Sequence, residues 1–409
     1  MPTPRKLPPI WLMGFGFFPL GAFGSLMLIT VPQLLAANHV PEAKIAAITA
    51  AGLLPGFLSF ALTPLLDWRF SRRAYAITFA IIGAVCGTLA LIEIADLPLL
   101  TALLFAGNFS IGLGVAAVGG WFGNLTTPEE KAGLGVWFTV SNLGLGGLVA
   151  TVAIYFLRDL PYDVGAVLLG LLVAAAVPLY LATDCPPADG RLASESFVAF
   201  ARDVLALVRR PTVLWSVLLF VMPAASFALT NTLSGFGADF HASEKMVATI
   251  GGLGVAVAGA VGSLLILPLS ARIAPRPLYL LVGGCGAIFT LALVLLPRGP
   301  LTFGLALLGE NVFQASSFST QNLIVLRTIG QDNPLAATQF GLLTSVSIIP
   351  LTYMQLIDGA AYGLGGVNGS YAADALVSGG AVVALGLVLW LLRRFVPPIP
   401  VAAALDEAA

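Results

Sequence analysis

Long apolar runs dominate this 409-residue chain and constrain its fold more than any other feature. Each of the twelve runs holds at least about 18 mostly apolar residues, enough for an α-helix to cross the hydrocarbon core of a bilayer. Only 10% of the residues are charged, against about 25% in soluble domains. The chain is therefore predicted to be an all-α membrane protein. The expected spans, numbered one to twelve, are residues 10–36, 43–65, 74–94, 97–119, 134–157, 164–182, 211–236, 245–270, 277–296, 301–327, 336–358 and 371–394.

The composition excludes several classes of function. The formal net charge is −1, which argues against nucleic acid as a partner. Cys86, Cys185 and Cys285 have no metal-ligand spacing, so we interpret them as packing residues. The sequence contains no phosphate-binding loop and no cluster of catalytic residue types. We therefore expect no enzyme activity, no bound cofactor or metal, and no transport driven by ATP.

Basic residues are distributed unevenly among the predicted loops. With a cytoplasmic N-terminus, fifteen Lys and Arg residues fall on the cytoplasmic side and four on the other. This bias follows the positive-inside rule, and an even number of spans then places both termini in the cytoplasm. The longest polar segment ends in an amphipathic pattern, which predicts a helix on the inner membrane face. We expect an N-terminal six-helix half (1–182), this linker (183–210), a C-terminal six-helix half (211–397) and a tail (398–409).

The two halves carry matching residues at a nearly constant offset. The only two histidines, His39 and His241, lie 202 residues apart in outer loops. The loops that begin at Pro64 and Pro268 match at four positions, and the Gly-Asn pair in span four matches a Gly-Glu pair in span ten. Three matches in the same order predict a duplicated six-helix unit. Two six-helix halves with a long linker are the layout of the major facilitator superfamily, in which substrate binds near the midplane and rocking halves give alternating access.

Span ten carries Glu310, the one acidic residue that we expect well inside the membrane. Gln314, Ser317 and Gln321 follow it at i+4, i+7 and i+11, so all four share a helix face about 60° wide. A charge in hydrocarbon costs at least about 2.5 kcal/mol, so this face should border the bundle interior or a wet cavity. We interpret Glu310 as the candidate proton-coupling residue and the other three as candidate substrate ligands. The alternative is a neutral Glu that joins two helices by a hydrogen bond.

Other polar residues within the apolar runs are further candidates for substrate contacts. They are Asn108, Asn142, Asn231 and Gln339. Small polar groups in membrane helices often bond their own backbone or a neighbouring helix, so a structural role is the competing interpretation. His39 and His241 are interpreted as helix-capping residues rather than as a pH sensor. Asp358 lies near the outer end of span eleven, where we expect it within reach of water.

The loop between spans two and three has an acidic residue, Asp67, followed by a basic cluster. Its position resembles the signature loop of the major facilitator superfamily, where a carboxylate at a helix end meets an Arg or a neighbouring helix N-terminus and latches the inner gate. The alternative is ordinary positive-inside charge. The second copy has Ala271 where the first has Asp67, so no latch is expected there. The candidate gate residues are Asp67, Arg69, Arg72, Arg73 and Arg276.

Several segments resemble the AmpG-type muropeptide permeases, which belong to the peptide–acetyl-coenzyme A–drug transporter branch of the superfamily. Residues 337–345 (ATQFGLLTS) carry the most specific likeness, together with Gly309-Glu310-Asn311 in span ten. Pro19-Leu20 followed by Gly24-Ser25, and the residues from Pro64 to Asp67, fit the same group. The likeness touches most of the chain, although there is no sign of the two extra spans that many AmpG proteins carry.

This resemblance implies a proton-driven importer of a bulky polar metabolite, such as an anhydro-muropeptide, in the bacterial inner membrane. Its expected partners are the substrate, protons and the lipid bilayer, and its expected state is a monomer. A siderophore importer of the same branch is an alternative. Efflux by antiport ranks lower, because span five has several glycines but lacks the Pro that such a transporter favours there. A non-transporting membrane receptor is the least favoured of these readings.

Overall fold

The computed structural model describes residues 7–185, 197–330 and 333–394. Within those ranges it is built of helices and contains no strand, which confirms the all-α class. Each predicted span contains helical structure, and continuous helices long and apolar enough to cross a membrane account for most of the spans. These are Ile10–Ala37, Arg72–Ile92, Leu97–Leu125, Glu130–Asp159, Tyr162–Ala182, Lys245–Ser270, Pro275–Leu293 and Ala336–Leu391.

The chain divides into two compact units. The first comprises Met1–Thr126, Ser141–Leu207 and Ile329–Ser345, and the second Thr127–Val140, Val208–Thr328 and Val346–Ala409. The predicted boundaries of the halves stay a prediction. Arg5, Lys6, Arg191, residues 186–196 of the predicted linker and the tail 398–409 lie outside the described residues.

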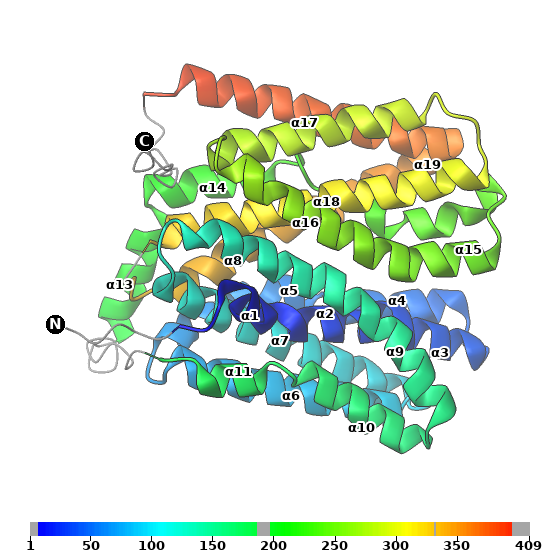
Figure 1. Cartoon of the computed structure of the whole chain (residues 1–409), viewed down its shortest axis with the longest axis horizontal. Coiled ribbons are helices and arrows are strands. Elements are labelled where there is room, and N and C mark those ends of the chain that lie inside the picture. The colour runs from blue at the N-terminus through cyan, green and yellow to red at the C-terminus, as the bar shows by residue number, and fades with distance from the viewer. Residues whose placement is uncertain (1–6, 186–196, 331–332, 395–409) are drawn as a thin grey trace. The chain divides into compact units, whose positions relative to one another are not determined.

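Most helices of the first unit are coloured from blue to teal in Figure 1, whereas its α13 (Phe197–Val208) is green and its part of α19 (Ala336–Leu391) is orange. A 3₁₀ turn (Phe15–Phe17) and a π-helical turn (Leu26–Thr30) join the three pieces of span one, and 3₁₀ turns continue span two as far as Asp67. The helices are α1 (Ile10–Gly14), α2 (Phe18–Ser25), α3 (Val31–Ala37), α4 (Glu42–Leu53), α5 (Pro55–Leu58), α6 (Arg72–Ile92), α7 (Leu97–Leu125), α9 (Gly146–Asp159), α10 (Tyr162–Val173), α11 (Val177–Ala182), most of α13 (Phe197–Val208) and the start of α19 (Ala336–Leu391).

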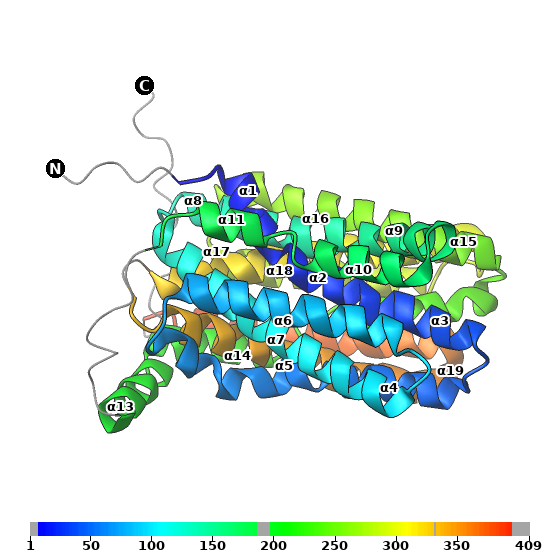
Figure 2. The same cartoon turned by 90° about the horizontal axis from the view of Figure 1, so that it is seen from below.

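Small residues bring the helices of this unit into backbone contact. A Cβ added to Gly21 of α2 would lie 2.1 Å from the carbonyl oxygen of Asn142, next to α9. Ser25 Oγ donates to the Gly146 carbonyl at 2.6 Å, which fixes the same helix pair. α6 packs along α7 and α10, as Figure 2 shows, and the Tyr162 hydroxyl of α10 donates to the Leu91 carbonyl of α6 at 2.8 Å. Because lipid tails are as apolar as the helix surfaces, the hydrophobic effect does not drive helices together within a membrane. Close packing and interhelical hydrogen bonds stabilise the bundle instead.

The second unit is organised around α18. Gly262 of α16 approaches the α18 backbone so closely that an added Cβ would lie 2.1 Å from the Val312 carbonyl oxygen. Ser316 of α18 donates to the Gly262 carbonyl at 2.8 Å. The helices are α8 (Glu130–Thr139), α14 (Pro211–Val221), α15 (Glu244–Thr249), α16 (Val255–Ser270), α17 (Pro275–Leu293), α18 (Pro300–Ile329) and the rest of α19, with 3₁₀ turns at Ala228–Asn231 and Leu233–Phe240 and a π-helical turn at Ile250–Gly254.

Two breaks in this unit were not anticipated. Span seven was expected as one helix over 211–236, but α14 ends at Val221 and regular helix is lost until Ala228. Pro223 has no N–H to donate, and Phe227 adopts left-handed backbone angles (φ 49°). Within α19 the helix turns back at Gly366, whose φ of 59° and ψ of −152° suit only glycine. Spans eleven and twelve are therefore the two arms of a tight helical hairpin.

The duplication predicted from the sequence is visible in the backbone. His39 and His241 both adopt left-handed angles, with φ of 56° and 53°. Few residues other than glycine do so, and both histidines stand at helix ends. α6 and α17 have 21 and 19 residues, and α7 and α18 have 29 and 30. Matching helices therefore follow each other at matching positions in the two sequence repeats.

Candidate functional site

The polar residues predicted on span ten are all buried in the second unit. Glu310 is 0% exposed, Ser317 1%, Gln314 6% and Gln321 7%. They occupy one α-helix, α18, so their spacing keeps them on a common face. A row of four buried polar side chains needs hydrogen-bond partners, because unpaired polar groups in an apolar interior are costly.

Gln314 and Ser317 find their partners at the break in span seven. Ser317 Oγ donates to the Ala225 carbonyl at 2.7 Å. Gln314 Nε2 donates to the Thr230 hydroxyl and, at 3.4 Å, to the Phe227 carbonyl. Non-helical backbone at membrane depth is tolerated only where protein or water satisfies it. Both side chains therefore stabilise the interruption, and their predicted contact with substrate stays a prediction.

Gln321 and Glu310 differ in how many of their polar atoms have hydrogen-bond partners. Gln321 Nε2 donates to Ser347 Oγ of α19 at 2.5 Å. Glu310 Oε1 accepts from Thr290 Oγ1 of α17, but Glu310 Oε2 is buried without a hydrogen-bond partner among the described residues. Aromatic rings of Phe289 and Phe313, 5.5 Å apart, line α17 and α18 at this level. The carboxyl group thus sits in an apolar setting with half of its hydrogen-bonding capacity unused.

Two further buried carboxyl groups accompany Glu310 in this unit. Asp358 is 2% exposed and Asp374 3%, so the expectation that water reaches Asp358 is wrong. The expectation of a single acidic residue deep in the membrane is wrong for the same reason. Asp374 and Asp358 both lie close enough to Glu310 to interact electrostatically with its carboxyl. The sequence analysis missed this second polar face, although the spacing of Tyr371, Asp374 and Ser378, at i, i+3 and i+7, could have indicated it.

The other predicted substrate contacts do not join this group. Asn108 is half-buried in α7, where its Nδ2 donates to the Gly52 carbonyl at 2.8 Å. Asn142 is half-buried in a π-helical turn of span five, and Asn231 is exposed in a 3₁₀ turn. Gln339 is 1% exposed, and its Oε1 accepts from Asn333 Nδ2 at 2.8 Å in the loop before α19. None of these placements tests a role in binding substrate.

Asp67 has the geometry expected of a latch. Its Oδ1 accepts from Arg72 Nε at 2.7 Å and from the Ala337 N–H at 3.2 Å. Its Oδ2 accepts from the N–H and the hydroxyl of Thr338, both at 2.7 Å. Asp67 therefore pairs with an Arg and caps the N-terminus of α19, where a negative charge is stabilised by the helix dipole. All these residues belong to the first unit.

Arg72 extends the same network. Its Nη2 donates to the carbonyls of Pro334 at 2.8 Å and Asn333 at 3.1 Å, so one guanidinium joins span three to the loop before α19. Arg69 is exposed, with its guanidinium carbon 5.5 Å from the centre of the Trp68 ring, and Arg73 is half-buried. Arg276 is buried in the first turn of α17. The gate role of these four residues and Asp67 stays a prediction.

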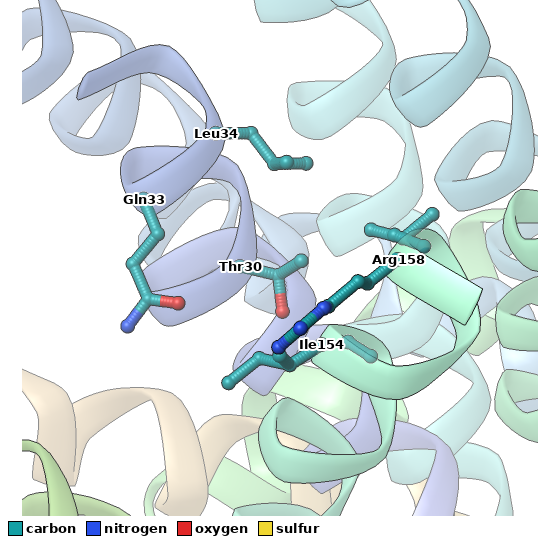
Figure 3. A pocket seen from close by; sticks show the side chains of 7 residues that line it. Thr30, Gln33, Leu34, Ile154 and Arg158 are labelled. Atoms are coloured by element: carbon teal, nitrogen blue, oxygen red, sulfur yellow. The ribbon is translucent and has the colours of Figure 1, made fainter. Parts of the chain in front are cut away.

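A cavity of about 230 Å³ lies in the first unit. It borders α3, the π-helical turn before it and the end of α9 (Figure 3). The Thr30 and Arg158 side chains point toward one another there, while the Gln33 amide lies on the other side of the opening. No residue predicted for a site lines this cavity. Its lining residues are Thr30, Gln33, Leu34, Ala153, Ile154, Leu157 and Arg158.

Apolar helices of spanning length, a duplicated unit and a buried polar helix face are typical of a multi-pass membrane transporter. The comparison with protein-family models makes this specific. The model of the Major Facilitator Superfamily matches residues 12–350. The chain belongs to the Major Facilitator Superfamily, whose members are secondary transporters. No curated protein matches the chain.

Solved structures support the same fold. The E. coli fucose:proton symporter matches with a TM-score of 0.68 and 17% identity, over 93% of this chain and 98% of that one. The proton:xylose symporter matches with a TM-score of 0.69 and 14% identity, over 95% of each chain. A bacterial homologue of the iron transporter ferroportin matches with a TM-score of 0.65 and 14% identity, over 95% of this chain and all of that one. At these identities the likeness shows the fold alone.

Proposed function

We propose that this protein is a proton-coupled importer of a bulky polar metabolite and that Glu310 is its proton-coupling residue. The observation that carries the proposal is the Glu310 carboxyl group, which is 0% exposed and has one oxygen without a hydrogen-bond partner among the described residues. An ionisable group within a membrane helix is expensive and marks ion or substrate pathways. Two structural neighbours are proton symporters, which agrees with this chemistry.

The hydrogen bonds of Thr290 favour a protonated Glu310. The Thr290 hydroxyl lies near Glu310 Oε1 and also 3.0 Å from the Gly286 carbonyl oxygen. A hydroxyl group has one proton to donate, so it cannot serve both acceptors at once. If Glu310 carries a proton and donates it to Thr290 Oγ1, Thr290 is free to donate to Gly286. The neutral acid therefore satisfies this site better than the carboxylate does.

The substrate class follows from the AmpG-like segments at residues 309–311 and 337–345. They favour an anhydro-muropeptide, with a ferric siderophore as the second candidate. In α18 the two amides, Gln314 and Gln321, are the candidate ligands for a polar cargo. The Asp67–Arg72 network and its cap on α19 would hold the cytoplasmic gate closed in one state of the alternating-access cycle.

Uptake by proteoliposomes tests the proposal. Purified protein is reconstituted, an inward proton gradient is imposed, and accumulation of an anhydro-muropeptide is compared with that of a ferric siderophore. We expect one of them to accumulate and a protonophore to abolish its accumulation. Glu310→Gln should lose uphill accumulation but keep exchange down a gradient, because the amide binds substrate without binding a proton. Glu93→Gln, which changes an exposed carboxyl group, is the matched control.

Three outcomes would contradict the proposal. Accumulation of either compound by Glu310→Gln at the wild-type level would remove Glu310 from coupling. Uptake only in vesicles of inverted orientation would favour the efflux antiporter. Tight binding with no flux in either orientation would instead favour a receptor.

A further inference from the structure

Three carboxyl groups share the interior of the second unit, and they come from two helices. Glu310 lies on α18, and Asp358 and Asp374 lie on the two arms of the α19 hairpin. Their exposed fractions are 0%, 2% and 3%. Four of their oxygens, Glu310 Oε2, Asp358 Oδ1, Asp358 Oδ2 and Asp374 Oδ1, are buried without a hydrogen-bond partner among the described residues.

The three groups also lie at a similar depth. Asp358 precedes the turn at Gly366 by eight residues and Asp374 follows it by eight, so each lies about 12 Å from the turn. Ser370 Oγ donates to the Asp358 carbonyl at 2.8 Å, which shows that the two arms pack together at this level. Glu310 lies ten residues into α18, about 15 Å from the same end of the helices. In a hydrocarbon core about 30 Å thick, these depths reach close to the midplane from the end predicted to be extracytoplasmic.

Two hydroxyl groups on α19 point to a ligand at this place. Tyr371 is 0% exposed and Ser378 5%, and both hydroxyl groups lack a hydrogen-bond partner among the described residues. They flank Asp374 at i−3 and i+4, so they lie on its face of the helix. Tyr371 also interacts electrostatically with Glu310. Five buried polar side chains of this unit thus have unused donors or acceptors, which natural interiors rarely leave unsatisfied.

The charges around the cluster do not compensate three carboxylates. The groups that act on Glu310 are Thr290 of α17 and the two aspartates. Tyr371 is also influenced by Arg298 and Asp239, which lie toward the surface; Arg298 is exposed. Several kcal/mol per buried ion would be needed to keep all three groups charged without a partner. Carboxyl groups in this situation become neutral by binding protons.

A metal ion fits the cluster less well than protons do. Ca²⁺ requires six to eight oxygen ligands and Mg²⁺ a near-ideal octahedron. In the part of the chain that the structure describes, no three acidic, histidine or cysteine residues are arranged to hold a metal ion.

We propose that Asp374 is a second proton-binding residue, which shares its site with Glu310 and Asp358. Asp374 then holds a proton at neutral pH, because its buried carboxyl group has an oxygen without a hydrogen-bond partner among the described residues. This deepens the proposed proton coupling, but the binding of protons by Asp374 can be tested without knowing the substrate. If Glu310 is the coupling residue, a site shared with Asp374 allows more than one proton to bind in each transport cycle.

Infrared spectroscopy of the full-length purified protein in lipid vesicles tests the proposal. Neutral carboxyl groups absorb at a frequency distinct from carboxylates, and the band shifts in D₂O. At neutral pH the wild-type protein should show this band. Asp374→Asn should reduce its area by an amount similar to the reduction in Glu310→Gln. Asp163→Asn, which alters an exposed carboxyl group on α10, should leave it unchanged.

The comparison of variants separates the possible failures. A band as large in Asp374→Asn as in Asp163→Asn would show that Asp374 is ionised, which overturns the proposal. Asp374→Glu keeps a carboxyl group and should retain the band, so a loss caused by misfolding is recognised. Interacting groups titrate together, so Glu310→Gln should move the pH at which the Asp374 band disappears; an unmoved titration would overturn the shared site. If Glu310→Gln still concentrates substrate while Asp374→Asn loses its band, the coupling role of Glu310 fails and the proton site stands.

Discussion

The fourth helix of each repeat, α7 in the first unit and α18 in the second, uses its matching polar residue in a different way. Asn108 of α7 is half-buried, and its Nδ2 donates a hydrogen bond to the Gly52 carbonyl. Glu310 of α18 is fully buried and leaves one oxygen unpaired. An amide can complete a helix contact but cannot bind a proton at neutral pH. The duplicated scaffold thus carries a neutral structural contact in one copy and a group capable of proton chemistry in the other.

The loops after the second span of each repeat also differ at one matching position, which is acidic in the first copy and apolar in the second. In the first copy, Asp67 pairs with Arg72 and caps α19. In the second copy Ala271 replaces the acid and is exposed, while Arg276 is buried. The first copy therefore has a carboxylate in this loop that accepts charge-assisted hydrogen bonds, whereas the second copy has alanine at that position.

The largest effect is expected when α18 receives the residue of α7. Glu310→Asn should abolish proton-driven accumulation of the transported compound while preserving its exchange, because Asn has no titratable proton. The measurement is uptake in proteoliposomes with and without a protonophore. Asn108→Glu, combined with Glu310→Asn, should not restore accumulation. Recovery in the double variant would show that the two repeats are interchangeable for coupling.

A smaller effect is expected at the latch. Asp67→Asn removes the charge that pairs with Arg72 and caps α19, and loss of one partner of a buried pair costs about 3–5 kcal/mol. Thermal unfolding of the purified protein in detergent should therefore shift to a clearly lower temperature. Arg73→Gln, which changes a half-buried neighbour in the same loop, is the control. Equal melting of the two variants would mean that the Asp67 network contributes nothing to stability.

Removing the contact of Asn108 should cost less. Asn108→Leu deletes one neutral hydrogen bond to Gly52, so we expect a loss of about 0.5–1.5 kcal/mol of stability. Transport should remain sensitive to a protonophore, since no proton-binding group is lost. If this variant folds but loses proton coupling, Asn108 of α7 has more than a structural role, and the proposed difference from Glu310 of α18 is wrong.

The smallest effect is expected when the second loop receives an acid. Ala271 is exposed and follows the C-terminus of α16. Asp there stays solvated and slightly opposes the helix dipole, so Ala271→Asp should change stability by no more than about 0.5 kcal/mol. A rise in melting temperature comparable with the fall in Asp67→Asn would reveal a latent latch in the second copy.

Much of the fold could be read from the sequence because hydropathy and the offset of the repeats are properties of the chain itself. The break in span seven could not. Pro223 lies where helix is lost, whereas Pro268 and Pro350 lie inside regular helices. A proline can interrupt a membrane helix only where other groups donate hydrogen bonds to the carbonyls that lose their helical partners. Here the donors are Ser317 and Gln314 of α18, far along the chain.

The acidic cluster was missed for a related reason. The predicted span eleven ended at 358, so Asp358 was expected within reach of water, and Asp374, near the start of the span predicted over 371–394, was assigned no role. Both helices continue to the turn at Gly366, which places Asp358 about two turns deeper and Asp374 about one turn deeper than the predicted spans implied. Hydropathy averages over a window and therefore does not locate the end of a helix to within two turns, whereas the depth of a carboxyl group depends on that end.

The interrupted span seven also bears on how the protein enters the membrane during synthesis. α14 has 11 residues and is about 16 Å long, roughly half the hydrocarbon thickness. It cannot complete a crossing as a regular helix, and the carbonyls beyond it receive donors from Gln314 and Ser317, which are translated about ninety residues later. Span seven should therefore be held only loosely by the bilayer until span ten has left the ribosome. We therefore expect the stable insertion of span seven to require α18.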